Sequence, residues 1–115
     1  MQYLLLIYGN EAGIQAASKA DVEKMVAAYG AYTEAIKKAG VLAGSNRLRP
    51  TTSASTVRVT DGKSKVLDGP YAETKEQLAG YYLIDVPDLD AALSWAARCP
   101  GASFGAIEVR PVWTM

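Results

Sequence analysis

The sequence predicts one α+β domain in which two helices cover one side of a sheet. Two observations carry this prediction: apolar runs of strand length recur along the chain, and two longer segments repeat their apolar residues at helical spacing. The 115 residues suit a single domain that spans residues 1–115. Half of the residues are hydrophobic and 21% are charged, which is a globular composition.

The first part of the chain predicts a strand, a long helix and a second extended segment. Residues 2–8 are a dense apolar run of strand length, and residues 11–17 are small and polar like a loop. Ser18 is expected to cap a helix that Gly40 ends. The segment after Gly40 is extended, with an interruption at Gly44-Ser45-Asn46. The buried stripe of the helix is expected to contain Val22, Met25, Val26, Tyr29, Thr33 and Ile36.

The middle of the chain predicts a β-hairpin. Residues 56–60 and 63–67 flank Asp61-Gly62, a pair that is typical of a two-residue hairpin turn. A second turn at Asp68-Gly69-Pro70 follows, and the polar segment 73–77 comes after it.

The last part of the chain repeats the order strand, helix, strand. An apolar strand over residues 80–86 precedes a helix that Asp88 caps, and residues 104–109 form the last strand. The buried face of this helix is expected to hold Leu89, Ala92, Leu93, Ala96 and Ala97. Two β-α-β halves with right-handed crossovers fold most simply as a ferredoxin-like βαββαβ sandwich, here with an added β-hairpin.

The two strands that this fold places in the centre are apolar on both faces. Alternate residues of 2–8 and of 80–86 point to opposite sides of the sheet, and both sets are apolar. Because two helices cover only one side, we expect a homodimer whose sheets pack face to face, a dimeric α/β barrel. The alternative is that the hairpin and the loop around residues 44–55 fold over the second face.

Composition excludes several classes of partner and cofactor. Twelve basic residues balance twelve acidic ones, so no excess positive charge favours nucleic acid or an anionic membrane surface. The chain has no histidine and one cysteine, Cys99, so we expect no transition metal and no other cofactor. The run at residues 3–8 lacks the features of a signal peptide, and the lone cysteine suits a reducing cytoplasm.

The segment from Asp68 to Leu78, DGPYAETKEQL, resembles the DGPF motif of the longer bacterial branch of the YciI-like family. Tyr71 stands where that motif usually has Phe. The resemblance covers nearly the whole chain, through segments such as Leu4 to Tyr8, Gly80-Tyr81-Tyr82 and Trp95 to Pro100. It implies a ferredoxin-like dimer but no particular reaction, and some relatives are associated with extracytoplasmic-function sigma factors.

Shorter YciI-like proteins carry a His and an Asp that have been proposed as an active site. The corresponding positions fall near Tyr29 and Cys99 in this sequence. Neither residue type is retained, so the resemblance transfers no catalytic pair.

Asp68 is the candidate catalytic residue. The Gly69-Pro70 turn would hold its carboxylate rigidly as an acid, a base or a ligand acceptor; alternatively, the carboxylate only accepts hydrogen bonds from turn amides. The candidate ligand-binding residues are Arg47, Arg58, Tyr29, Tyr71, Glu73 and Lys75.

Four of these ligand-binding candidates also have an ordinary structural explanation. Glu73 and Lys75 suit a solvated charge run, Arg58 an intramolecular ion pair, and Tyr29 the core. The sequence predicts a small polar metabolite, bound or transformed near the Asp68 turn, and leaves open whether the protein is an enzyme. The alternative is a non-catalytic regulatory protein, linked to a sigma factor.

Overall fold

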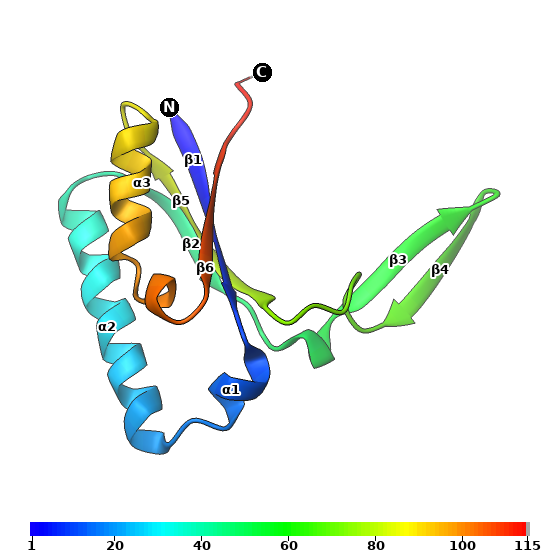
Figure 1. The fold of residues 1–115 in the computed structure, drawn as a ribbon. Coiled ribbons are helices and arrows are strands. Elements are labelled where there is room, and N and C mark those ends of the chain that lie inside the picture. The colour runs from blue at the N-terminus through cyan, green and yellow to red at the C-terminus, as the bar shows by residue number, and fades with distance from the viewer. Residues whose placement is uncertain (115) are drawn as a thin grey trace.

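A computed structural model of the chain describes residues 1–114 (Figure 1). Residues 1–114 form six strands, three α-helices and two single-turn 3₁₀ helices. In chain order they are β1 (Gln2–Gly9), α1 (Glu11–Gln15), α2 (Lys19–Lys38), β2 (Leu42–Arg47), η1 (Thr51–Ser53), β3 (Ser55–Thr60), β4 (Lys63–Asp68), β5 (Gln77–Asp85), α3 (Leu89–Arg98), η2 (Pro100–Ser103) and β6 (Ala106–Pro111).

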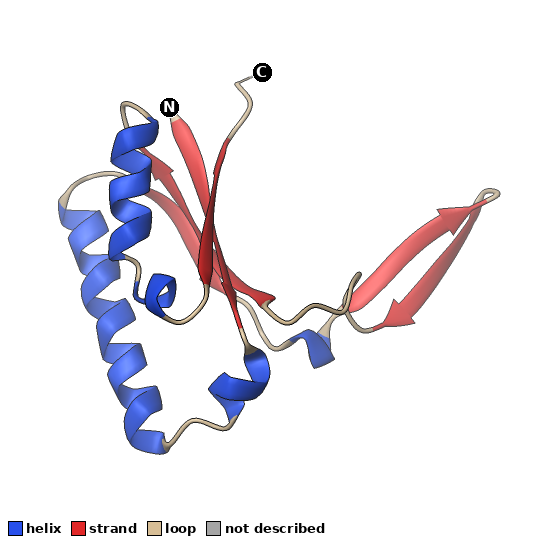
Figure 2. Cartoon of the chain, viewed as in Figure 1, coloured by secondary structure: helices blue, strands red, loops and turns tan. Residues whose placement is uncertain are grey.

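Four of the strands form an antiparallel sheet in the order β2-β5-β1-β6. A strand from the other half of the chain lies between the two strands of each β-α-β unit, so β5 separates β1 from β2 and β1 separates β5 from β6. Helices α2 and α3 lie on one side of this sheet (Figure 2). The α+β class is therefore confirmed, and the arrangement is compatible with the predicted ferredoxin-like fold.

The core lies between the sheet and these two helices. Leu5, Ile36 and Ile84 have no exposed surface, and burying side chains of this size stabilises the fold by roughly 1.5–3 kcal/mol each. The other buried apolar residues are Tyr3, Ile7, Tyr32, Tyr82, Val86, Ala92, Ala96 and Cys99.

Two core tyrosines pack their rings in the apolar core and form hydrogen bonds with their hydroxyl groups. The rings of Tyr32 and Tyr82 meet edge to face, with centroids 5.2 Å apart. Tyr32 donates its hydroxyl hydrogen to the carbonyl oxygen of Trp95 at 2.7 Å, and the hydroxyls of Tyr82 and Thr33 are 2.7 Å apart. A buried tyrosine hydroxyl needs such a partner, so these bonds help to fix α2 and α3 on the sheet.

Local turn chemistry agrees with the sequence. Ser18 accepts a hydrogen bond from the Asp21 amide and begins α2, and Gly40 ends it with a φ of 73°. Asp61 and Gly62 have φ values of 52° and 75°, as a type I′ hairpin turn requires. Asp88 likewise caps α3, accepting a bond from the Ala91 amide.

The predicted loop over residues 11–17 is wrong, because Glu11–Gln15 form the short helix α1. Asn10 begins it by accepting a hydrogen bond from the Gly13 amide. The predicted break at Gly44-Ser45-Asn46 is wrong as well. These residues belong to β2, and the register shift between Leu42 and Gly44 absorbs the irregularity as a bulge.

Both predicted helix stripes were too wide. Val22 and Val26 are 39% and 58% exposed, since the first turns of α2 extend past the end of α3 (Figure 1). In α3 only Ala92 and Ala96 of the predicted face are buried, and the exposed residues of that face are Leu89, Leu93 and Ala97. At about 100° per residue, Leu89, Leu93 and Ala97 lie about 40°, 80° and 120° around the helix from the middle of the buried pair, progressively farther from the contact.

The hairpin β3–β4 does not fold over the sheet. It forms its own two-stranded sheet and stands apart from the body, on the side away from α2 and α3 (Figure 1). The intramolecular alternative for covering the second face is therefore not what this chain adopts. Within residues 1–114, no helix is long and apolar enough to cross a membrane.

Two glycines predict opposite effects of the same substitution. An alanine Cβ at Gly105 would clash with the carbonyl oxygen of Tyr8, a backbone atom that cannot move aside cheaply. We expect Gly105→Ala to lower the free energy of unfolding by about 2 kcal/mol or more in urea denaturation. Gly30 lies inside α2 with no atom within 4 Å of such a Cβ, so Gly30→Ala should raise it by about 0.5–1 kcal/mol. Equal effects would contradict the placement of β6 against β1.

The core also predicts a loss of stability at alkaline pH. Burial raises the pKa values of Tyr32, Tyr82 and the Cys99 thiol above those of the unfolded chain. The folded state therefore binds more protons, so stability is complete below the unfolded pKa values, about 8.5 for Cys and 10 for Tyr, and falls as pH rises through them.

Above pH 10, each buried tyrosine should cost up to about 1.4 kcal/mol per pH unit, measured by urea unfolding from pH 8 to 11. Tyr82→Phe should flatten this slope, whereas Tyr71→Phe, which removes a hydroxyl from a side chain that is 76% exposed, serves as the control. A slope that Tyr82→Phe leaves unchanged would contradict the assignment.

Candidate functional site

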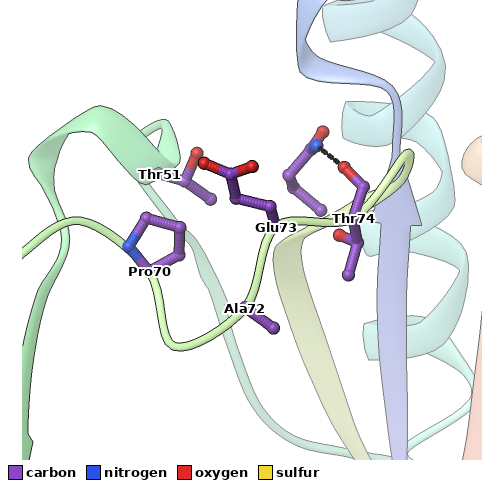
Figure 3. A pocket seen from close by; sticks show the side chains of 6 residues that line it. Thr51, Pro70, Ala72, Glu73 and Thr74 are labelled. Carbon is purple, nitrogen blue, oxygen red and sulfur yellow. Dashed lines mark hydrogen bonds between the residues drawn. The ribbon is translucent and has the colours of Figure 1, made fainter.

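A cavity of about 320 Å³ lies beside the turn that joins the hairpin to β5 (Figure 3). We call it the turn pocket. It is lined by Thr51, Pro70, Ala72, Glu73, Thr74 and Gln77. Its walls come from η1, from the turn after β4 and from the first residue of β5. The pocket thus lies within the segment that carries the most specific motif of the sequence.

Gly69 and Pro70 give the turn its shape. Gly69 has a φ of 111°, a conformation that side chains rarely adopt, and the Pro70 ring fixes the next φ. The Gly69 amide donates to the carbonyl oxygen of Ala54 at 2.7 Å, and the Thr56 hydroxyl donates to the carbonyl oxygen of Gly69 at 2.8 Å. These bonds fasten the start of the pocket wall to the base of the hairpin.

Glu11 holds the opposite side of the pocket. Its carboxylate accepts hydrogen bonds from the amide and the hydroxyl of Thr51, both at 2.7 Å. Its own amide donates to the side-chain oxygen of Gln77 at 3.0 Å. The residue at the start of α1 therefore ties η1 and β5 together.

Several polar side chains of the pocket wall are already used within the chain. The Gln77 side-chain nitrogen donates to the carbonyl oxygen of Thr74 (Figure 3), and the Thr74 hydroxyl donates to the carbonyl oxygen of Glu76. The Thr51 hydroxyl hydrogen is given to Glu11. The Glu73 carboxylate has no hydrogen-bond or ion-pair partner among residues 1–114, so it remains free as an acceptor.

The exposed side chain of Asp68 lies outside the pocket lining, two residues before Pro70. At the end of β4 it pairs across the hairpin with Ser55. Within the described chain its carboxylate accepts no hydrogen bond from the turn amides and forms no ion pair with Arg47, Arg58 or Lys75. The side chain is thus not needed to build the turn.

The structure brings two of the predicted residues together and separates the others. The guanidinium group of Arg58 lies over the Tyr71 ring, 4.9 Å from its centroid. Arg47 lines a different cavity, of about 250 Å³, with Leu48, Arg49 and Pro50. Lys75 is exposed, lies in a loop and does not line the turn pocket.

Tyr29 is half-buried on α2, away from the turn pocket. The Cys99 thiol, which is 2% exposed, lies 3.8 Å from the Tyr29 hydroxyl. Burial raises the pKa of both groups, so both are neutral at physiological pH. The two positions that the resemblance links to a catalytic pair are therefore neighbours, but they hold a tyrosine and an unreactive thiol.

Sequence reasoning missed Glu11, Thr51 and Gln77. The contacts among them join residues 40 and 66 positions apart, which no local pattern reveals. The one available signal was Asn10, a residue type that often begins a helix and would have drawn attention to Glu11.

Comparison with known proteins identifies the family of the chain. A family model for the YCII-related domain matches residues 1–115. An uncharacterized protein of Rhizobium meliloti (strain 1021) is 44% identical over 114 residues, which cover 97% of this chain and 92% of that protein. Over its whole length, the chain belongs to the family of proteins with a YCII-related domain.

Proposed function

We propose that the protein is a homodimer that binds a small polar metabolite with hydrogen-bond-donating groups, an amine or a polyhydroxylated compound, in the turn pocket. The observation that carries the ligand class is the free Glu73 carboxylate, beside the hydroxyls of Thr51 and Thr74, whose hydrogens are already given to protein oxygens. A carboxylate acts only as an acceptor, so it favours ammonium or hydroxyl groups and opposes anions.

The cavity volume agrees with a compact ligand. About 320 Å³ lies at the lower end of the range for small-molecule sites. The links from Glu11 to Thr51 and Gln77 hold the wall in place before a ligand arrives, which lowers the entropy cost of binding.

Asp68 is the residue that we propose for any acid–base step. Its carboxylate accepts no hydrogen bond from the turn amides, and it stands two residues before Pro70, which lines the pocket. A ligand that extends beyond the cavity toward β4 would meet this second carboxylate.

The proposed dimer rests on the uncovered face of the sheet, which we call the open face. Its centre is apolar, since Leu4 pairs with Leu83 and Leu6 with Tyr81 across β1 and β5. All four side chains are half-buried, in contrast to the buried residues on the helix side.

The margins of the open face are polar. Arg110 and Glu108 form an ion pair on β6, opposite Leu4 and Leu6, and the Asn46 amide donates to the Tyr81 hydroxyl at 2.8 Å on β2. An apolar centre with a polar rim is the usual anatomy of a protein interface and supports packing of two copies face to face.

Replacing one leucine tests the dimer. Light scattering should give twice the chain mass of 12.2 kDa for the native protein. Leu4→Asp should weaken the dimer at least about a hundredfold, because it places a charge at the centre of an apolar interface. Leu93→Asp makes the same change on α3, where the leucine is 47% exposed, and should leave the dimer intact. A native protein that stays monomeric at 100 μM concentration would refute the homodimer.

A thermal-shift screen tests the pocket. Amino alcohols, polyamines and polyols are compared with hydroxy acids and phosphates as probes. A ligand at a hundred times its Kd adds about 2.7 kcal/mol of stability, which corresponds to a rise in Tm of several degrees. We expect hits only among the donor-rich compounds, and we expect Glu73→Gln to abolish their shift.

Two variants serve as controls in this screen. Glu23→Gln makes the same chemical change at an exposed position of α2 and should preserve every hit. Asp68→Asn should keep the Tm of the free protein, since the carboxylate supports no turn hydrogen bond, and should weaken the hits that extend past the pocket. Hits confined to anions, or hits that survive Glu73→Gln, would contradict the proposed ligand class.

A further inference from the structure

We propose that the β3–β4 hairpin is a dimerisation arm whose valine-bearing face packs against a second copy of the chain. This inference rests on the proposed homodimer and adds to it a surface that the open face does not include. The argument uses the two faces of the hairpin, its direction, and the amount of surface that one chain leaves exposed.

The two faces of the hairpin differ in character. Val57 pairs with Val66, and Val59 lies on the same face opposite Ser64. These valines are 60%, 64% and 67% exposed for Val57, Val66 and Val59 respectively. We call this the valine face. The other face carries Arg58, Lys63 and Lys65 together with Leu67 and two threonines, so it is mainly cationic and polar, whereas the valine face carries its one charge, Asp68, at the base of the hairpin.

A hairpin of this kind is not stable alone. Two strands without a packed face are marginally stable in water at best. Here the hairpin has no second layer over the valine face within residues 1–114, because it stands clear of the body (Figure 1). The valine face therefore needs a cover that the described part of one chain does not supply.

The surface of one chain leaves ample area for that cover. A compact monomer of 12.2 kDa exposes about 6,100 Å², whereas this chain exposes 8160 Å². Its radius of gyration is 16.0 Å, against about 13 Å for a compact domain of this length. The excess of about 2,000 Å² is more than twice the roughly 800 Å² that each partner buries in a standard interface.

The direction of the hairpin identifies the occupant. The hairpin leaves the body on the side of the open face, where a second copy would sit (Figure 1). Sheets that pack face to face lie about 10 Å apart, and strands of six residues reach about 20 Å. The arm is thus long enough to cross the interface and to lay its valine face against the partner, and two-fold symmetry doubles each contact.

Single-cysteine reporters test this arrangement. Val66→Cys and Lys65→Cys place thiols on adjacent residues of β4 that point to opposite faces, while native Cys99 is 2% exposed and unreactive. Each thiol is alkylated with a maleimide in the native protein and in the protein unfolded in urea. The ratio of the two alkylation rates measures the protection of that thiol. At 100 μM protein we expect the thiol at position 66 to react at least tenfold more slowly than the thiol at position 65. The difference should vanish on dilution below the dimer Kd.

A pair of double variants provides a second readout. Val57→Ser with Val66→Ser should weaken the dimer at least tenfold in sedimentation, whereas Arg58→Ser with Lys65→Ser should leave it unchanged. A dimer in which both reporter thiols react equally would overturn the arm and leave the homodimer standing. Protection that persists in the monomer would also overturn it, because the arm would then pack on its own chain. A protein that is monomeric throughout refutes the homodimer itself, and the arm with it.

Discussion

The structure depends on one imbalance in hydrophobic burial. Strands β1 and β5 are apolar on both faces, but the chain has helices for one face only. The covered side holds Leu5 and Ile84 with no exposed surface, whereas Leu4 and Leu83 on the other side keep part of theirs. Burial of apolar surface is the main favourable term in folding. The second face is apolar surface that one chain leaves uncovered, so covering it would add to stability. The proposed homodimer and the proposed role of the arm both rest on this imbalance.

Much of the fold was predictable because its signals are local. Asp61-Gly62, Ser18 and Gly40 each specify a turn or a helix end through their own backbone and side-chain chemistry, and all three act as expected. The apolar runs of β1 and β5, which continue on both faces of the strand, identified the central strands. The helix stripes were less accurate, since residues such as Val22 repeat at helical spacing although no neighbouring element covers them.

The site was less predictable, because its order comes from contacts distant in sequence. The motif located the pocket through Pro70 and Glu73, but its other wall depends on Glu11, which sequence reasoning assigned to a loop. Charge type alone also suggested that arginines face the site, whereas Arg58 lies over an exposed tyrosine ring. Which polar atoms remain free depends on every hydrogen bond around them, and that information is not local.

The hydrogen bonds of Gly69 with Ala54 and Thr56 connect the hairpin mechanically to the turn pocket. The residues that end the hairpin are followed directly by the pocket wall, because β4 ends at Asp68 and Pro70 lines the pocket. A displacement of the arm would therefore also displace Pro70. Contact of the arm with a second copy would then restrict the movement of the pocket wall. A ligand in the turn pocket would in turn restrict the movement of the arm. Affinity for the ligand and affinity for the second copy would then be thermodynamically linked and equal in their mutual effect. The dimer fraction would then depend on the concentration of the metabolite, and the affinity for the metabolite would depend on the concentration of the protein.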